Sequence, residues 1–294
     1  MKIILIASGS RGDVQPYVAL GQGLQAAGHT VRLLAQQDFR ELVTGHGLEF
    51  FEMGASAQAA AQSQMQGLVE EGNLLKILAA TGRGAQQMAH QAAVAGLAAA
   101  PGSDLIIGGL GGVFIGLALG QKLNIPFLQA YLLPLSPTRA FPSALAPLPQ
   151  TPLTTWANGL SHRVAQTMLW QMFRAADHAA RSQVLGLPPA SFWGPLAALQ
   201  RANPTVLYGY SPRVVPPPAD WSPALHVTGY WFLDAPADWQ PPAHLADFLR
   251  AGPPPVYIGF GSMVNTKPEA TAALVLQALA RTGQRGLLSA GWGA

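Results

Sequence analysis

The chain opens with Ile3-Ile4-Leu5-Ile6-Ala7-Ser8-Gly9-Ser10-Arg11-Gly12-Asp13-Val14-Gln15-Pro16, and this stretch decides the fold. Its first five residues form an unbroken apolar run, which is typical of a strand buried on both faces of a parallel sheet. Gly9 and Gly12 predict a tight turn where backbone can come close to a ligand. From Val14 the apolar spacing becomes helical, and Pro16 suits the first turn of a helix. The stretch therefore predicts a strand, a glycine loop and a helix N-terminus, which together favour phosphate binding.

Two common phosphate-binding motifs do not fit this loop. Arg11 stands where the dinucleotide fingerprint G-x-G-x-x-G needs its second glycine. The loop also lacks the pattern G-x-x-x-x-G-K-[ST]. A dehydrogenase in which Asp38 binds a ribose is the alternative, but the sequence lacks the glycine motif that this class of enzyme needs.

From Gly9 to Val31 the sequence reads GSRGDVQPYVALGQGLQAAGHTV. This run strongly resembles the N-terminal motif of the sterol and antibiotic glycosyltransferases, of the family 1/28 type. Members of that family use nucleotide sugars and pair two Rossmann-like domains in the GT-B fold. The resemblance implies that Asp13 is the general base. By spacing alone, Asp13 could instead be the N-cap of the helix.

Composition excludes several classes of protein. The 294 residues are 49% hydrophobic and only 11% charged, which is enough apolar material for a large core. The net charge of +3 comes without a basic run, so we expect no nucleic-acid partner. The absence of cysteine excludes disulfides and fits a reducing compartment. The N-terminal apolar run is too short for a signal peptide, so a cytoplasmic location is expected.

The segment 105–121 could be mistaken for a membrane span, since it carries no charge and has a glycine at every fourth position from Gly108. A span needs about 20 apolar residues with fewer glycines. We therefore expect a strand at 105–107, a glycine loop at 108–112 and a helix at 113–123, and at most peripheral membrane contact.

Strand-like and helix-like segments alternate along the chain. Strands are expected at 3–7, 30–35, 48–53, 105–107, 127–131 and 206–210, with helices between them. The segment 58–100 predicts one or two helices with a break near Gly82-Arg83-Gly84. This alternation predicts an α/β fold with a Rossmann-like, doubly wound parallel sheet, followed by the first elements of a second Rossmann-like domain.

The predicted domain organisation has three parts. Residues 1–211 form the N-terminal domain on the acceptor side, residues 212–240 form a proline-rich linker, and residues 241–294 begin a donor-binding domain. The second domain opens with PPPVYIGFGSM at 253–263, which matches the corresponding start in the same glycosyltransferases. The resemblance implies that the chain stops before the donor signature, and we expect an N-terminal portion that is inactive alone.

The resemblance also implies the site. Ser10, Arg11 and Gly12 from one domain and Gly261 and Ser262 from the other would flank the diphosphate of a UDP-sugar. Asp13 would take the proton of the acceptor hydroxyl as it attacks the sugar in an inverting transfer. No metal and no cofactor is expected, because the seven histidines form no ligand motif.

The loop 131–142 resembles a loop near the acceptor cleft of the sterol-type enzymes. Its apolar side chains suit a hydrophobic acceptor such as a sterol, a lipid or a polyketide. Tyr131, Pro134, Thr138 and Phe141 are the candidate acceptor residues. A proline-stiffened surface loop is the alternative.

The function expected from this sequence is hexosyl transfer from a UDP-sugar to a hydroxyl of a hydrophobic acceptor. A complementing C-terminal half or another chain is an expected partner. The alternative from another class is a non-catalytic subunit in which the N-terminal domain binds a small molecule or a partner protein.

Overall fold

The structure is a computed structural model that describes residues 1–54, 56, 58, 74–145, 155–202, 204–235, 238–263, 267–289 and 291. The chain divides into two compact units. The first contains Met1–Ala57 with Ala79–Leu233, and the second contains Gln58–Leu78 with Asp234–Ala294. Each unit is described separately.

A seven-stranded parallel sheet forms the centre of the first unit, in the order β3-β2-β1-β4-β5-β6-β7. Its strands are β1 (Lys2–Ile6), β2 (Thr30–Ala35), β3 (Glu49–Glu52), β4 (Leu105–Gly108), β5 (Phe127–Tyr131), β6 (Val206–Tyr208) and β7 (Leu225–Val227). After β3 the chain returns to the other side of β1, so the order reverses between β1 and β4. The predicted doubly wound α/β fold is confirmed.

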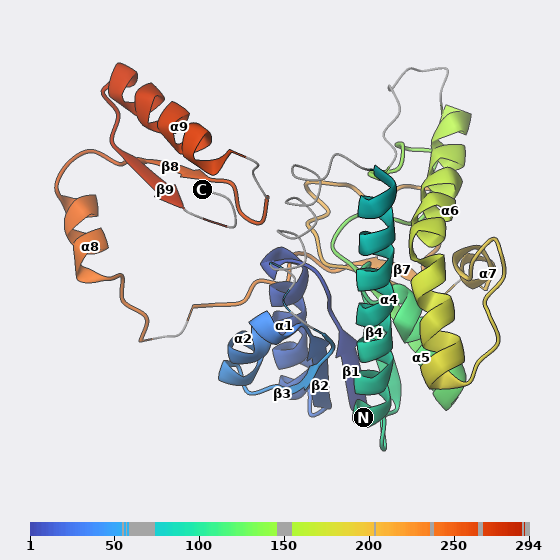
Figure 1. Ribbon diagram of the computed structural model, residues 1–294. Coiled ribbons are helices and arrows are strands. Elements are labelled where there is room, and N and C mark those ends of the chain that lie inside the picture. Colours follow the sequence, from blue (N-terminus) through green and yellow to red (C-terminus); the bar gives the residue numbers. More distant parts are fainter. Residues whose placement is uncertain are drawn as a thin grey trace. The chain divides into compact units, whose positions relative to one another are not determined.

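Helices cover both faces of this sheet (Figure 1). They are α1 (Arg11–Ala26), the 3-10 turn η1 (Gln37–Phe39), α2 (Arg40–Gly45), α4 (Leu74–Ala99), α5 (Val113–Leu123), α6 (Thr155–Ala180), the π-helical turn η3 (Arg181–Leu185) and α7 (Leu196–Arg201). Helix α4 runs through Gly82-Arg83-Gly84 without the predicted break.

The core lies on both sides of β1, as the continuous apolar run requires. Ile3 and Leu5 pack with Val14 and Val18 of α1 on one face. Ile4 and Ile6 pack with side chains of α4 and α5 on the other. All four isoleucine and leucine side chains are at most 2% exposed. Burying such a side chain stabilises the fold by about 1.5–3 kcal/mol.

The segment 105–121 belongs to this α/β layer. It forms β4 and most of α5, whose Gly116 packs directly against the ring of Phe127. Among the described helices, none is both long enough and apolar enough to cross a bilayer. The glycine spacing therefore serves close packing of α5 on the sheet.

The second unit contains α8 (Ala243–Arg250), β8 (Val256–Gly259), α9 (Pro268–Thr282) and β9 (Gly286–Ser289). Strands β8 and β9 pair in parallel with α9 as their crossover, which is the predicted strand, helix and strand. Neither α8 nor α9 has a buried residue. Within the stretch expected as the linker, Leu225–Val227 is the edge strand β7 of the first unit.

Candidate active site

The candidate site lies where the strand order reverses, at the carboxyl ends of β1 and β4. Ligands of open α/β sheets bind at this switch point. The loop Ser8–Ser10 follows β1 and leads into α1, while Gly109–Gly112 follows β4 and leads into α5. The two loops touch, because a Cβ on Gly111 would collide with the Ser8 carbonyl.

Asp13 is the third residue of α1, and Ser10 is the N-cap. One carboxylate oxygen, Oδ2, accepts hydrogen bonds from the Ser10 N–H at 2.8 Å and from Ser10 Oγ at 2.9 Å. Both hydrogen bonds that the described residues give to this carboxylate go to Oδ2. Asp13 as a whole is an exposed residue. The alternative that Asp13 is the N-cap is therefore wrong: Ser10 holds that position, and Asp13 lies three residues further on and accepts a hydrogen bond from the Ser10 N–H.

Gly9 permits this arrangement. Its φ of +137° lies in a region that residues with a side chain rarely adopt. A Cβ at this position would also overlap the Asp13 carboxylate. The absence of a side chain at Gly9 therefore leaves the space that the Asp13 carboxylate occupies.

Tyr17 lies one turn further along α1 and is buried beneath the site. Its hydroxyl donates a hydrogen bond to the carbonyl of Ala130 in β5. Burial, and then the negative charge of Asp13, raise the pKa of Tyr17 far above its ordinary value. The phenol therefore stays protonated and acts as a fixed tie between α1 and β5.

A cavity of about 320 Å³ opens beside this loop. Its lining comes from the start of α1, from Leu132 and Gly209 directly after β5 and β6, and from three consecutive aromatic residues, here called the aromatic wall. The lining residues are Arg11, Gly12, Gln15, Pro16, Leu132, Gly209, Tyr230, Trp231 and Phe232. This volume lies at the lower end of the range for small-molecule sites.

The aromatic wall is held in place by specific contacts. The Trp231 ring meets Tyr17 edge to face, with centroids 5.8 Å apart, and its Nε1 donates to Thr228 Oγ1 at 2.9 Å. A Cβ on Gly209 would collide with the Trp231 ring, so only glycine allows this approach. Tyr230 and Phe232 pack on each other at 5.4 Å. The sequence offered one signal for this wall, the run Tyr230-Trp231-Phe232, but it lies in the stretch expected as a linker.

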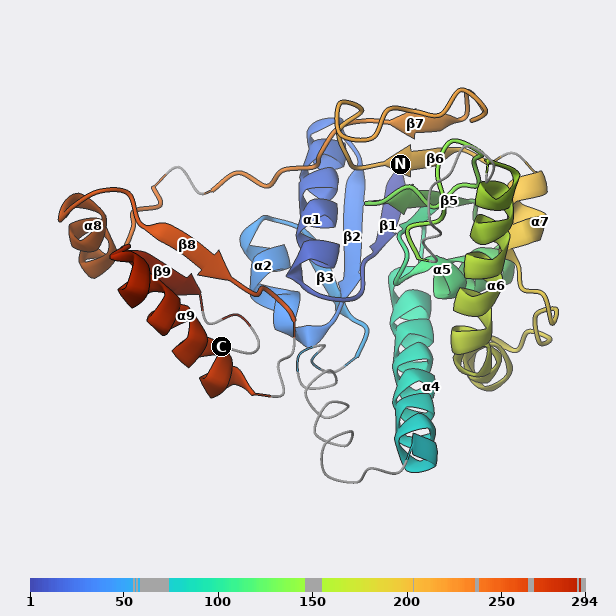
Figure 2. The same ribbon diagram turned by 90° about the horizontal axis from the view of Figure 1, so that it is seen from above.

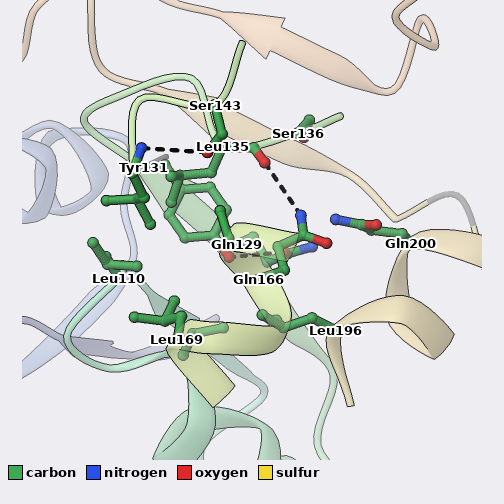
Figure 3. A pocket seen from close by; sticks show the side chains of 13 residues that line it. Leu110, Gln129, Tyr131, Leu135, Ser136, Ser143, Gln166, Leu169, Leu196 and Gln200 are labelled. Carbon is green, nitrogen blue, oxygen red and sulfur yellow. Dashed lines mark hydrogen bonds between the residues drawn. The ribbon is translucent and has the colours of Figure 1, made fainter. Parts of the chain in front are cut away.

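A second hollow lies between the loop after β5 and α6, and Figure 3 shows Tyr131, Leu135, Ser136 and Gln166 around it. Its volume is about 20 Å³, which is room for about one water molecule. Tyr131 Oη donates to Gln129 Oε1 at 2.8 Å inside it, and Gln166 Nε2 donates to the Leu135 carbonyl at 3.3 Å. A sugar or a ring system does not fit there.

The four candidate acceptor residues have structural contacts of their own. Tyr131 and Thr138 are buried, at 5% and 2% exposure, and Pro134 and Phe141 are half-buried. Thr138 Oγ1 donates to Asp220 Oδ1 at 2.6 Å, and the Phe141 carbonyl lies 3.1 Å from His162 Nε2. The structure brings none of these four to the lining of the larger cavity.

The predicted donor-side residues fall in different units. Ser10, Arg11 and Gly12 lie at the start of α1 in the first unit, where Arg11 Nε donates to Gln15 Oε1 at 2.8 Å. Gly261 and Ser262 follow β8 in the second unit, and Gly261 has a φ of +58°. A diphosphate site that joins both groups stays a prediction. Among the described residues, no three His, Asp or Glu side chains gather where they could hold a metal.

Comparisons with known proteins agree on a family. Residues 3–142 match the model of the glycosyltransferase family 28 N-terminal domain. The chain is 33% identical to the sterol 3-beta-glucosyltransferase UGT80B1 of Arabidopsis thaliana, covering 100% of this chain and 48% of the relative. It is also 33% identical to the sterol 3-beta-glucosyltransferase of Cryptococcus neoformans, covering 99% of this chain but only 18% of the relative. The chain thus spans half or less of the length of these curated relatives.

Among solved structures, the glycosyltransferase UGT89C1 of Arabidopsis thaliana in complex with quercetin matches 99% of this chain and 65% of its own. The TM-score is 0.53 at 14% identity. This likeness concerns the fold, which is that of the GT-B glycosyltransferases.

Proposed function

The chain belongs, through residues 3–142, to the glycosyltransferase family 28 N-terminal domains, and on that premise we propose that it is the acceptor-side part of a hexosyltransferase. The enzyme transfers a hexose from a UDP-sugar to a hydroxyl group of a hydrophobic acceptor. The observation that carries this proposal is the cavity of about 320 Å³ with an aromatic wall, whose lining includes Gly12, the chain neighbour of the exposed Asp13. Asp13 itself is not one of the lining residues.

The chemistry follows from the environment of Asp13. The acceptor hydroxyl gives its proton to this carboxylate while its oxygen attacks the anomeric carbon of the sugar. The new bond joins the acceptor oxygen to the anomeric carbon, and the bond from that carbon to the diphosphate breaks. UDP leaves from the opposite face, so the configuration inverts. Ser10 holds Oδ2, so the geometry of the carboxylate is fixed before the acceptor arrives.

The acceptor class is proposed from the walls of the cavity. Leu132, Pro16 and the aromatic run at 230–232 offer apolar surface, while Gln15 and Arg11 offer polar groups at one side. A flat ring system with one hydroxyl matches this division, since its rings pack on the aromatic side chains. A sterol has this form, and the sterol 3-beta-glucosyltransferases to which the chain is similar support the choice.

The donor side is proposed to complete the site. Gly261 and Ser262 would hold the diphosphate together with Ser10, Arg11 and Gly12, with residues 241–294 as the start of the donor domain. Because this chain spans 48% of its Arabidopsis relative, transfer by this chain alone is expected to be absent. A module that only binds the acceptor is the second candidate, since both the cavity and Asp13 lie in the first unit.

Fluorescent sterol binding tests the cavity. Dehydroergosterol is itself fluorescent, so a titration followed by its own directly excited emission reports binding whether or not Trp231 is present. We expect Trp231→Ala to weaken binding by about tenfold or more, because the ring forms much of the wall. Trp239→Ala is the matched control, since this exposed tryptophan lies in the other unit. Equal binding by both variants would contradict the assignment of the cavity.

A further inference from the structure

Helix α6 carries a row of large apolar side chains that face water. Trp156, Leu160, Val164, Met168 and Met172 follow one another at four-residue spacing, and each is between 45% and 73% exposed. Residues four apart are neighbours on a helix surface, so the five side chains form a continuous ridge. The opposite side of α6 already packs on the protein, where Trp170 is 1% exposed. A helix facing water normally carries polar residues on its outer side, whereas on α6 this apolar row runs between exposed polar residues such as Arg163 and Gln171.

Two more aromatic side chains are held beside this ridge. Phe192 and Trp193 are 56% and 70% exposed and pack edge to face at 5.1 Å. The Phe192 carbonyl accepts hydrogen bonds from Trp170 Nε1 at 2.9 Å and from Gln171 Nε2 at 2.8 Å, which tie the pair to the middle of α6. The Arg174 guanidinium lies 4.9 Å from the centre of the Phe192 ring. The pair is therefore fixed in an exposed position by contacts on its inner side.

The charge around these side chains is mainly positive. Residues 105–220 contain seven Lys or Arg and two acidic residues, Asp177 and Asp220. Asp220 is exposed and accepts hydrogen bonds from Thr138 Oγ1 and the Arg139 N–H. Asp177 is buried and paired with Arg181 at 2.8 Å, so it shows no charge at the surface. Arg163 lies on α6 beside the ridge and is exposed, as is Arg201 of α7. The surface thus combines apolar side chains with an excess of cations.

Exposed apolar side chains together with cations favour the surface of an anionic lipid bilayer as the partner. Tryptophan is favoured at the boundary between lipid and water, apolar ridges insert among acyl chains, and each cation near an anionic leaflet adds attraction. A second copy of the same face would bring arginine against arginine, which disfavours self-association. Figures 1 and 2 both show α6 at the periphery of the first unit, where a flat surface can reach it.

We propose that the ridge of α6 together with Phe192 and Trp193, here called the α6 face, binds the surface of an anionic lipid bilayer. The ridge and the aromatic pair enter the boundary between headgroups and acyl chains, and the arginines lie among the headgroups. The helix lies on the membrane and does not cross it. This proposal stands on the surface alone and would hold for a sterol-binding module as well as for an enzyme.

Vesicle flotation tests the α6 face. The full chain is mixed with sterol-free vesicles of phosphatidylcholine, either pure or with about 30% phosphatidylserine, at low and high salt. We expect binding to the anionic vesicles that weakens with salt. Phe192→Ser with Trp193→Ser should lower the partition coefficient by about tenfold or more, through lost apolar burial. Arg163→Ala should lower it by about fivefold on anionic vesicles and leave it unchanged on neutral ones.

Two variants serve as controls. Trp239→Ser removes an equally large, 56% exposed side chain elsewhere and should leave flotation unchanged. Trp231→Ala alters the acceptor cavity and should also leave it unchanged, which separates this proposal from the proposed function. The proposal is overturned if the wild type does not bind anionic vesicles at low salt, or if Phe192→Ser/Trp193→Ser floats like Trp239→Ser. Light scattering that shows a wild-type dimer, converted to monomer by Phe192→Ser/Trp193→Ser, would assign the face to a second copy and also overturn it.

Discussion

Asp13 has an observed role at the start of a helix and a proposed role in a reaction. Its Oδ2 accepts two hydrogen bonds from Ser10 at the start of α1, and the residue as a whole is exposed. The spacing of the sequence predicted a capping role, and the family resemblance predicted a base. The structure gives the N-cap to Ser10, with Asp13 accepting its hydrogen bonds, and the role of Asp13 as a base stays a prediction.

Gly9→Ala tests whether the backbone of the loop positions this carboxylate. The substituted Cβ would overlap Asp13, and the φ of +137° is unfavourable for alanine. We expect turnover of the intact enzyme to fall at least as far as it does with Asp13→Asn, with a loss of about 1–3 kcal/mol in unfolding free energy. Gly23→Ala is the matched control, since a Cβ there meets nothing within 4 Å. Activity retained in Gly9→Ala would show that the loop tolerates another geometry.

At the scale of elements, the strands and most helices could be predicted from the sequence. Apolar runs identify β1, β2 and β4 because both faces of a parallel sheet are buried. Strand β7 could not be predicted, since three residues in a proline-rich stretch become a strand only by pairing with β6. The break predicted at Gly82–Gly84 was wrong, because two glycines cost about 2 kcal/mol in a helix of 26 residues and good helix formers surround them.

The lining of the cavity was not predicted as such. The sequence singled out Arg11 and Gly12 for the donor diphosphate, because the loop and helix motif is local in sequence, and in the structure both line the cavity. The aromatic wall at 230–232 was missed, since three adjacent aromatic residues have neither helical nor strand periodicity. Their contacts with Tyr17 and Gly209 are made across more than 20 residues of chain and leave no pattern in the sequence.

Asp220→Asn tests how the loop after β5 is held. Burial acts to raise the pKa of Asp220, but hydrogen bonds from Thr138 Oγ1 and the Arg139 N–H outweigh it and hold the pKa below its ordinary value. A carboxyl with a lowered pKa in the folded state contributes stability above its unfolded pKa and loses it as pH falls through the folded one. We therefore expect Asp220→Asn to lower Tm at about pH 7 and to differ little from wild type at about pH 2–3.

Thermal melts of both proteins across this pH range provide the measurement. Asp234→Asn, outside this network, is the control and should melt like the wild type at each pH. A constant difference between Asp220→Asn and wild type at all pH values would mean that the charge of Asp220 contributes nothing.

At the scale of the whole molecule, the two units differ in how much apolar surface each of them buries. The first unit encloses a core on both sides of its sheet, whereas β8 exposes Val256 and Tyr257 by 44% and 67%. Two paired strands with one crossover helix bury little apolar surface. The second unit therefore contributes little stability of its own.

Hydrogen exchange measures this difference. Amides of β8 and β9 should exchange at least about a hundredfold faster than those of β1, because local opening there exposes little apolar surface. The sample must be monomeric by light scattering, since a partner chain on the strand edges would slow exchange. Equal protection of β8 and β1 in a monomer would contradict the description of the second unit.

The central claim is that Asp13 takes the proton from an acceptor hydroxyl during sugar transfer. Turnover of labelled UDP-glucose with a sterol by the intact enzyme that contains this chain tests it most directly, with Tm measured on the same samples. We predict that Asp13→Asn lowers turnover by about 10²- to 10⁴-fold and shifts Tm little, while Asp38→Asn keeps both. Near-normal turnover by Asp13→Asn would contradict the account and leave Asp13 with its hydrogen bonds to Ser10 alone.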